Sequence, residues 1–389
     1  MNGRERLIKT LKREKPDRVP WAPLIEYNFL NAQPDNIREL GVVGFCKKYN
    51  IDIIAKNTVG AYKVYSPNVS VKTFINGKEI EVPEEKDNWQ AEVYGVFSLY
   101  KYRSPEVKTI EKFFETPIGN LKTSYKNLPS SRTIFQDEFF IKKIEDLKIL
   151  KFMYEDITYI PNYDDIEKED DFIGKDGIVA AGVPGSAVIE LMEEYTGISD
   201  FHYLLNDYKV QMEEIMDCMF AKNLEAYKIA AKSTSPLLVV WEDAGTGLYS
   251  PEIFKKYIQP VLRKYAEIAH ENDKTILLHA CGLISDLIDD IINTGIDGIT
   301  DMSSYPTGNV EFLDVRRQAG KDIILTGGID PTIITSKDEN ILRENVEKLI
   351  GDMKPYGNFI LGSADAMPAN TPIKNLEIIY EIVEERGYY

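Results

Sequence analysis

The chain has 389 residues, with 46 Lys and Arg against 63 Asp and Glu, so its formal net charge is −17. This acidic balance argues against a nucleic-acid partner, and no apolar run reaches the roughly 18 residues that a membrane span needs. With 43% hydrophobic residues, only three cysteines and no signal-peptide core at the N-terminus, the chain is typical of a globular cytoplasmic protein without a disulfide framework.

Three strands are predicted in the N-terminal half, at residues 18–25 (RVPWAPLI), 51–55 (IDIIA) and 177–182 (GIVAAG). About 110 residues separate the last two, which is too long for a crossover. That interval contains Asn76-Gly77, a strong hairpin signal, and the aromatic runs 93–102 and 113–125. We therefore expect an antiparallel β-rich insertion at 58–170 after the second strand. The charged segment 162–172 reads as a solvated linker within it.

Five further strands follow in the C-terminal half, each a short apolar run, at 237–240, 275–278, 298–300, 323–326 and 358–361. Continuous hydrophobicity indicates strands that are buried on both faces, as in a parallel sheet. A helix is expected to begin at Ser250-Pro251 and run to Ile268, kinked at Pro260, and Gly320 should end another. Eight strands with helices between them predict a single α/β domain over 1–389, a (β/α)8 TIM barrel.

The end of the fifth strand carries an imidazole and a thiol two residues apart, in LLHACG. On extended chain His279 and Cys281 point to the same face, which suits two ligands of a zinc ion, and Gly282 lets backbone approach closely. The alternative is a half-buried cysteine beside a hydrogen-bonded histidine. The remaining cysteines and histidines lie in helical patterns and are expected to be structural: Cys46, Cys218, His202 and His270.

Several motifs resemble one family, in the same order along the chain: ERLIKTLKREKPDRVP, WEDAGTGLYSP, LLHACG, TGGIDP and GSADAMPANTPIKN. Together they are similar to the uroporphyrinogen decarboxylase superfamily, over essentially the whole chain. Within it, the sequence looks most like the cobalamin-dependent methyltransferases, especially those that act on methoxylated aromatic compounds.

Two departures from the superfamily pattern bear on chemistry. Decarboxylases carry an arginine-bearing stretch after the first strand, where this chain has Glu26 in PLIEYNFL; an acidic residue would repel a polycarboxylate. Thiol-directed methyltransferases add a second cysteine after the eighth strand, where this chain reads GSADAMP. Asp365 and Glu242 are then the candidates for a third zinc ligand. A site with one thiolate keeps zinc more electrophilic, which favours removing a methyl group from an ether oxygen.

The resemblance implies a zinc-dependent methyltransferase that moves a methyl group from a small O-methylated substrate, such as a methoxylated aromatic, to cobalt. The corrinoid would come from a partner protein, because the chain lacks the D-x-H-x-x-G pattern of cobalamin-binding modules. Asp243 and Glu26 would orient substrate or ligands. Two alternatives remain, a methyl-corrinoid:thiol methyltransferase and a non-catalytic tetrapyrrole- or corrinoid-binding barrel. A homodimer is compatible with each.

Overall fold

The computed structural model describes residues 1–80, 108–128 and 133–389 and divides into two compact units. The barrel unit comprises Met1–Lys56, Asp165–Ala180 and Thr234–Tyr389. The second unit comprises Asn57–Asp164 and Ala181–Ser233. The chain therefore passes between the two units four times, at 56/57, 164/165, 180/181 and 233/234.

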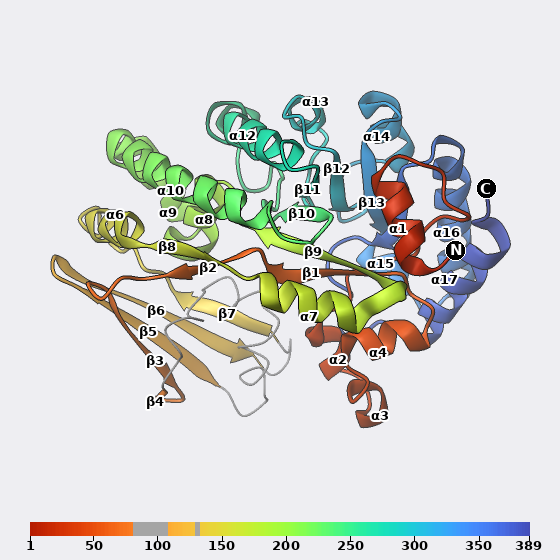
Figure 1. The fold of residues 1–389 in the computed structure, drawn as a ribbon, viewed down its shortest axis with the longest axis horizontal. Coiled ribbons are helices and arrows are strands. Elements are labelled where there is room, and N and C mark those ends of the chain that lie inside the picture. The colour runs from red at the N-terminus through yellow and green to blue at the C-terminus, as the bar shows by residue number, and fades with distance from the viewer. Residues whose placement is uncertain (81–107, 129–132) are drawn as a thin grey trace. The chain divides into compact units, whose positions relative to one another are not determined.

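A curled seven-stranded sheet forms the centre of the barrel unit (Figure 1). Its spatial order is β1 (Ile53–Val59), β9 (Gly177–Val183), β10 (Leu237–Val240), β11 (Thr275–His279), β12 (Gly298–Met302), β13 (Ile324–Ile329) and β14 (Phe359–Ser363). The pairs from β10 to β14 are parallel, and these strands are almost entirely buried. Each of the seven overlaps a predicted strand, because short apolar runs without alternation are typical of strands that are buried on both faces.

The eighth member of the barrel is the extended segment around Trp21. The Leu361 N–H donates to Pro20 O, the Ala22 N–H donates to Leu361 O, and the Asp52 N–H donates to Trp21 O. The segment thus bridges β14 and the residue just before β1, which closes the predicted (β/α)8 arrangement. It forms isolated bridges rather than a continuous strand, since Pro20 and Pro23 have no N–H to donate to a ladder.

Helices connect these strands and cover the sheet. They are α1 (Gly3–Leu11), α2 (Tyr27–Asn31), α3 (Asp35–Arg38), α4 (Gly41–Lys48), α7 (Tyr163–Ile173), η3 (Gly174–Asp176), α11 (Pro251–Ile253), η5 (Phe254–Ile258), α12 (Gln259–His270), α13 (Ile288–Ile292), α14 (Phe312–Ala319), α15 (Pro331–Ile334), α16 (Glu339–Met353), η6 (Lys354–Tyr356) and α17 (Ile373–Arg386). Both chain ends lie in this unit, where the Val19 N–H donates to Gly387 O and the Tyr389 N–H donates to Asp17 O (Figure 1).

The helix predicted from Ser250 is confirmed and is divided near Pro260. Ser250 caps its first turn by accepting a hydrogen bond from the Ile253 N–H. The π-helical turn η5 then separates α11 from α12, and Pro260 stands in the first turn of α12, where a missing N–H costs nothing. The predicted end of α14 is also confirmed, because Gly320 follows it with φ at 78°.

The prediction of a solvated linker at 162–172 was wrong. These residues form most of the helix α7, whose Ile166 and Ile173 are fully buried. The two isoleucines are seven residues apart and therefore lie on one helix face. The high charge of this segment suggested a loop, but one apolar face of the helix packs into the protein.

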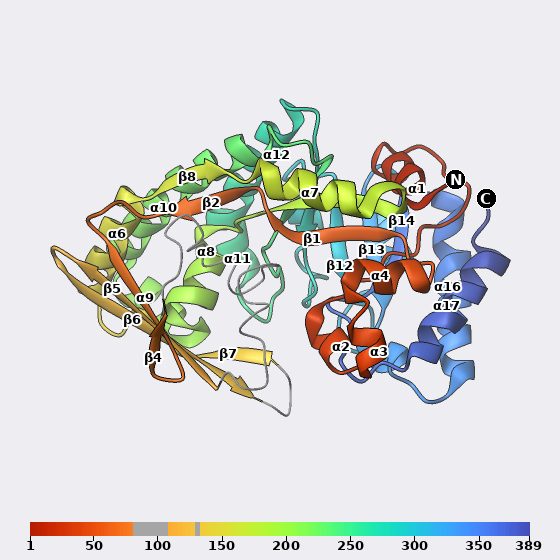
Figure 2. The ribbon, with the colours of Figure 1, turned by 60° about the horizontal axis from the view of Figure 1, so that its bottom comes forward.

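The second unit contains the predicted antiparallel insertion (Figure 2). Its five-stranded sheet has the order β4 (Lys78–Ile80), β3 (Ser70–Ile75), β5 (Thr109–Thr116), β6 (Gly119–Leu128) and β7 (Thr133–Glu138), and β2 (Ala61–Val64) pairs with β8 (Thr158–Pro161). The helices are α6 (Asp146–Asp156), α8 (Ala187–Glu190), η4 (Leu191–Thr196), α9 (Ile198–Asp207) and α10 (Lys209–Ala230).

The hairpin predicted at Asn76-Gly77 joins β3 to β4, and both turn residues have positive φ, 50° and 77°. Positive φ at both positions is what a type I′ turn requires. The aromatic run 113–125 falls in β5 and β6, as expected for strands. The aromatic run 93–102 lies outside the described residues.

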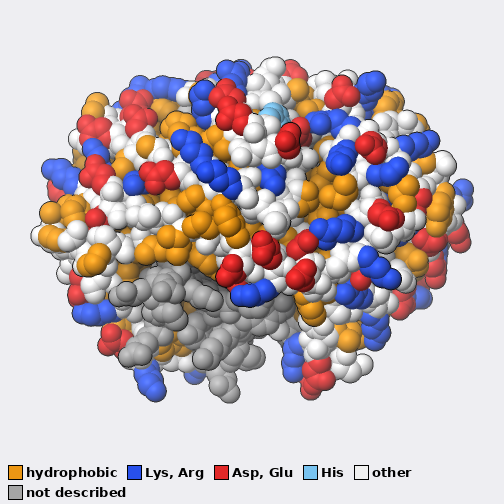
Figure 3. All heavy atoms as spheres, viewed as in Figure 1, with side chains coloured by type: hydrophobic (Ala, Val, Ile, Leu, Met, Phe, Trp, Pro, Cys, Tyr) orange, Lys and Arg blue, Asp and Glu red, His pale blue; other side chains and the backbone are white. Residues whose placement is uncertain are grey.

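Acidic and basic side chains are interspersed over the face drawn in Figure 3. Among the helices that the structure describes, none combines the length and apolar character needed to cross a membrane.

Candidate metal centre

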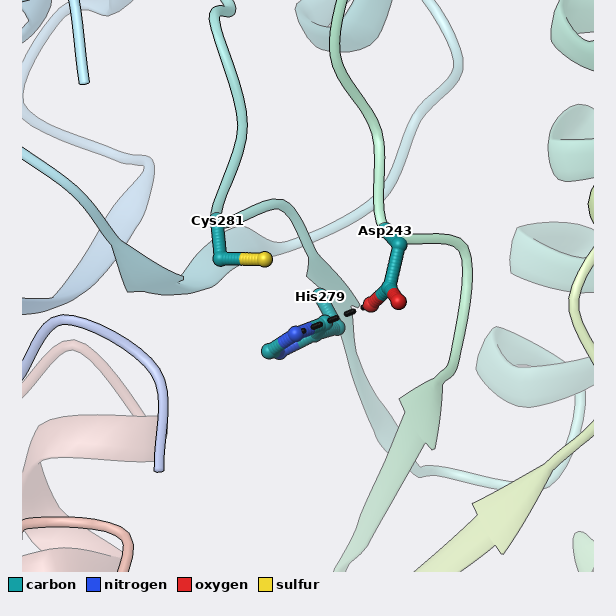
Figure 4. Close-up of side chains that lie close together, drawn as sticks. All are labelled: Asp243, His279 and Cys281. Atoms are coloured by element: carbon teal, nitrogen blue, oxygen red, sulfur yellow. Dashed lines mark ion pairs between the residues drawn. The ribbon is translucent and has the colours of Figure 1, made fainter. Parts of the chain in front are cut away.

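Three potential metal ligands meet where β10 and β11 end. His279 is the last residue of β11, Cys281 follows it, and Asp243 lies in the loop after β10. One ligand atom from each lies within 4.8 Å of the other two. In Figure 4 the thiol and the carboxylate converge on one side of the imidazole. The structure therefore brings His279 and Cys281 together as their spacing predicted, and adds Asp243 to them.

A pair of glycines lets the two ligand-bearing loops approach. A Cβ atom built on Gly282 would lie 3.1 Å from Ala244 O and 3.1 Å from the Cα of Gly245. A Cβ on Gly245 would meet the Cα of Gly282 at 3.0 Å. The close approach predicted for Gly282 is thus seen, and it draws the loop that carries Asp243 against the loop that carries Cys281.

Both ring nitrogens of His279 face carboxylates. Nε2 lies 3.0 Å from Asp243 Oδ1 and 3.8 Å from Asp365 Oδ1, on the side of the thiol. Nδ1 lies 3.0 Å from Oδ2 of Asp301, which is buried. A histidine whose Nδ1–H donates to a carboxylate presents the Nε2 lone pair outward, as metal-binding histidines commonly do.

Asp301 is itself held by Lys56, a residue that sequence reasoning missed. Lys56 Nζ donates to both carboxylate oxygens of Asp301, at 2.5 and 2.7 Å, and to Thr300 Oγ1 at 2.9 Å. Only 4% of the Lys56 surface is exposed. A lysine within the buried strand sequence IIAKN was the available signal, since buried lysines are rare without a partner.

The ionisable groups of this cluster shift one another's pKa values. Burial lowers the pKa of His279, but the charge of Asp243 and the hydrogen bonds with Asp243 and Asp301 outweigh it and raise the pKa well above its ordinary value. Burial raises the pKa of Cys281, which the neighbouring His279 partly offsets. Burial also raises the pKa of Asp365. For Asp301 the charge of Lys56 and the contact with His279 exceed the effect of burial, so its pKa lies well below the usual range.

The other predicted site residues occupy different surroundings. Asp365 follows β14, and its side chain is half exposed beside His279. Glu242 is fully buried and accepts a hydrogen bond from the Tyr249 hydroxyl at 3.4 Å. Glu26 stands at the N-cap of α2 without a capping hydrogen bond from its side chain. Glu242 is therefore not part of the cluster formed by Asp243, His279 and Cys281.

Three aspartates of this region have left-handed backbone. The φ angles are 46° at Asp243, 62° at Asp301 and 66° at Asp365. This conformation costs a residue other than glycine on the order of 1 kcal/mol, and such strain collects where side chains must point in one direction. Each of these aspartates lies at or just after the end of a barrel strand, where barrel active sites are built.

The donor set suits a zinc ion. Nitrogen, thiolate sulfur and carboxylate oxygen are all zinc ligands, and three protein ligands leave a fourth position for substrate. The imidazole is already oriented by Asp301 with Nε2 toward the other two ligand atoms. Zinc would also stabilise the deprotonated thiol, which burial by itself disfavours.

Comparison with known proteins gives consistent results. The family model described as uroporphyrinogen decarboxylase (URO-D) matches residues 145–386, more than half of the chain. The uroporphyrinogen decarboxylase of Orientia tsutsugamushi is 31% identical over 91 residues, which cover 23% of this chain and 25% of that protein. The alignment thus spans about a quarter of that relative's length.

The fold itself is shared with a methyltransferase from Methanosarcina mazei. The two structures superpose with a TM-score of 0.60 at 13% sequence identity, over 99% of each chain. At this identity the likeness concerns the fold. The family model, which matches more than half of the chain, shows that this protein belongs to the uroporphyrinogen decarboxylase family.

Proposed function

We propose that this protein is a zinc-dependent methyltransferase that moves a methyl group from a small O-methylated substrate, such as a methoxylated aromatic, to the cobalt of a separate corrinoid protein. The observation that carries the proposal is the convergence of Asp243, His279 and Cys281 at the strand ends of a barrel. The methyltransferase whose fold the chain shares supports the reaction class. The resemblance in sequence motifs supports the corrinoid partner.

His279 Nε2, Cys281 Sγ and an Asp243 oxygen would hold the zinc ion. When bound there, zinc supplies a Lewis acid for the ether oxygen of the substrate. Asp243 replaces Glu242 in this assignment, because Glu242 is buried against Tyr249 while Asp243 already contacts the imidazole.

The remaining side chains bind and orient. Asp365 presents a half-exposed carboxylate 3.8 Å from the imidazole, where it can align a substrate or serve as an alternative oxygen ligand. The indole of Trp241 lies against the His279 ring, with centroids 5.0 Å apart, and offers a flat surface to an aromatic ring. Glu26 after the first barrel segment would keep polycarboxylates away.

The direction of transfer follows from the single thiolate. The other two cysteines lie on helices and do not belong to the cluster: Cys46 is buried within α4, and Cys218 lies on α10 of the second unit. A ligand set with one sulfur leaves zinc more electrophilic than one with two, which suits withdrawal of charge from an ether oxygen. Methylation of a thiol is therefore the less favoured direction.

The test is metal analysis combined with a methyl-transfer assay on the purified chain. We expect about one zinc per chain, and transfer of a methyl group from a panel of methoxylated aromatics to a reduced corrinoid protein, followed by the corrinoid absorbance. Cys281→Ser should lose the zinc and the transfer, whereas the matched control Cys218→Ser should keep both. A Cys281→Ser protein with a full complement of zinc would contradict the assignment. A zinc-free wild type would favour a non-catalytic binding protein.

A further inference from the structure

The irregular backbone of β12 turns one carboxylate toward the candidate metal centre. The register between β12 and β13 shifts between Ile299 and Met302, so the regular ladder is interrupted at Thr300-Asp301. Such a bulge redirects a side chain that regular alternation would place elsewhere. The Asp301 N–H donates to Thr326 Oγ1 at 3.1 Å, which helps to hold this backbone in place.

The redirected carboxylate lies between a lysine and the histidine. Its oxygens accept from Lys56 Nζ, and its Oδ2 also contacts His279 Nδ1. The three side chains are between 2 and 4% exposed, so water contributes little. The hydroxyl of Thr300 contacts the carboxylate at 3.0 Å and the hydroxyl of Thr326 at 2.9 Å. The contacts with Lys56, His279 and Thr300 therefore limit rotation of the carboxylate.

From this arrangement we infer that Lys56 and Asp301 are positioning residues for the metal centre: they fix the ring orientation of His279 with Nε2 toward Asp243 and Cys281. Lys56 Nζ donates to both oxygens of the Asp301 carboxylate, and the same carboxylate contacts His279 Nδ1. The lysine therefore fixes the group against which the imidazole ring is oriented. The inference rests on the proposed function, since it concerns how the chain prepares a zinc ligand.

Stability by itself does not account for this ion pair. Burying a lysine and an aspartate costs desolvation, and well-packed apolar residues of similar size usually do as well. The bulge and the left-handed φ of Asp301 add backbone cost at the same point. These costs coincide at the Asp301 carboxylate, which contacts His279 Nδ1, and this coincidence is what a positioning role requires.

The experiment measures zinc affinity by chelator competition for the full chain and four variants. Asp301→Asn and Lys56→Met should weaken zinc binding about 10- to 100-fold, as removal of such outer partners does in other zinc sites. Lys56→Arg, which keeps the cation, should recover most of the affinity. The matched control is Asp52→Asn, which removes the charge of another buried ion pair, between Arg6 Nη1 and Asp52 Oδ1 at 2.6 Å. Neither residue is close in sequence to Asp243, His279 or Cys281. This variant should change zinc affinity less than threefold.

A second readout follows the histidine itself. The chain has only three histidines, so ¹⁵N-histidine labelling gives few signals to assign. In the zinc-loaded wild type, His279 should show a protonated Nδ1 with a proton shifted downfield by its carboxylate acceptor. Asp301→Asn should lose that shift, and this measurement needs only folded protein. Because asparagine is nearly isosteric with aspartate, Asp301→Asn also covers the case in which Lys56→Met fails to fold.

Zinc affinities of Asp301→Asn and Lys56→Met within threefold of a tightly binding wild type would overturn the inference and leave the proposed function intact. An equal loss in Asp52→Asn would also overturn it, because the effect would then be general destabilisation. A wild type that binds no zinc would instead overturn the proposed function, and the inference with it.

Discussion

Two lysines from neighbouring stretches of the chain are both buried, yet their surroundings differ. Lys56 lies in β1 of the barrel unit and contacts both oxygens of Asp301. Lys63 lies in β2 of the second unit and donates to the Tyr154 hydroxyl at 3.2 Å, with its Nζ 4.7 Å from the centre of that ring. Lys56 thus contacts a carboxylate directly, whereas the hydrogen bond of Lys63 goes to a tyrosine hydroxyl.

The carboxylates respond accordingly. The pKa of Asp301 is held well below its usual range, whereas burial raises the pKa of Glu190 despite the nearby charge of Lys63. Tyr154 lies between Lys63 and Glu190: its hydroxyl accepts from Lys63 and donates to Glu190 Oε2 at 3.0 Å. The same hydroxyl also contacts the Tyr195 hydroxyl. The two buried lysines thus differ in the groups that their contacts lead to. The barrel cluster differs because it ends on an imidazole, a thiol and a carboxylate that can share a metal.

The largest effect is expected from breaking the cluster of the second unit. Lys63→Met should destabilise the fold by about 3 kcal/mol, because it removes a buried cation whose charge acts on the buried Glu190 and Glu194, and a hydrogen-bond donor to the Tyr154 hydroxyl. Zinc content should not change. Urea unfolding measures the loss, with Lys72→Met as control: the Lys72–Glu115 pair is exposed and should contribute less than about 1 kcal/mol. A loss below 1 kcal/mol for Lys63→Met would mean that this lysine compensates no buried charge.

Variants of the adjacent residues Glu242 and Asp243 test which of the two is the third zinc ligand of the barrel cluster. Asp243→Ala should weaken zinc binding about 10- to 100-fold, or about 1.4–2.8 kcal/mol at 1.4 kcal/mol per factor of ten, because it removes a ligand. Glu242→Gln should leave zinc affinity within threefold, since the buried side chain lies against Tyr249. Chelator competition measures both. The reverse ranking would return the ligand role to Glu242.

A smaller effect should follow from pushing the two ligand loops apart. Gly282→Ala places a Cβ about as close to Ala244 O and Gly245 as contacts allow, at 3.1 Å from each. The loops must then move by a few tenths of an ångström, which we expect to weaken zinc binding about three- to tenfold. Gly247→Ala is the matched control in the same loop, because nothing lies within 4 Å of its added Cβ. Equal affinities of the two variants would show that the loop approach is not limiting.

The smallest effect concerns Glu169, a partly buried carboxylate whose pKa is raised in part by two aspartates. Burial, together with the charges of Asp165 and Asp170, raises the pKa of Glu169 in α7 from 4.5 to about 7. The folded state thus binds a proton that the unfolded state has released, and stability falls as pH rises from about 4.5 to 7. Because the side chain is only partly buried, solvent screening reduces the effect of this shift. Glu169→Gln should therefore gain about 1 kcal/mol at pH 8 and nothing at pH 4, measured by urea unfolding. An equal gain at both pH values would exclude ionisation as the cause.

Local patterns in the sequence were sufficient for most of the architecture. Buried parallel strands need continuous apolar runs, a type I′ turn needs two residues that tolerate positive φ, and a helix that ends in left-handed backbone favours glycine. These are short-range requirements, so the seven strands, the Asn76-Gly77 hairpin and the Gly320 helix end were predictable. The convergence of His279 and Cys281 followed from the two-residue period of extended chain in the same way.

Tertiary structure decided which acidic residues lie next to His279 and Cys281. The two-residue period holds only while backbone stays extended, and Asp243 and Asp301 leave that conformation with φ angles of 46° and 62°. Their side-chain directions therefore could not be read from alternation. The sequence left Asp365 and Glu242 as candidates for the third ligand and gave Asp301 no role. The partner of Lys56 could not be identified for a related reason: Asp301 lies 245 residues away in the sequence, and only the folded barrel unit brings β1 and β12 together at this carboxylate.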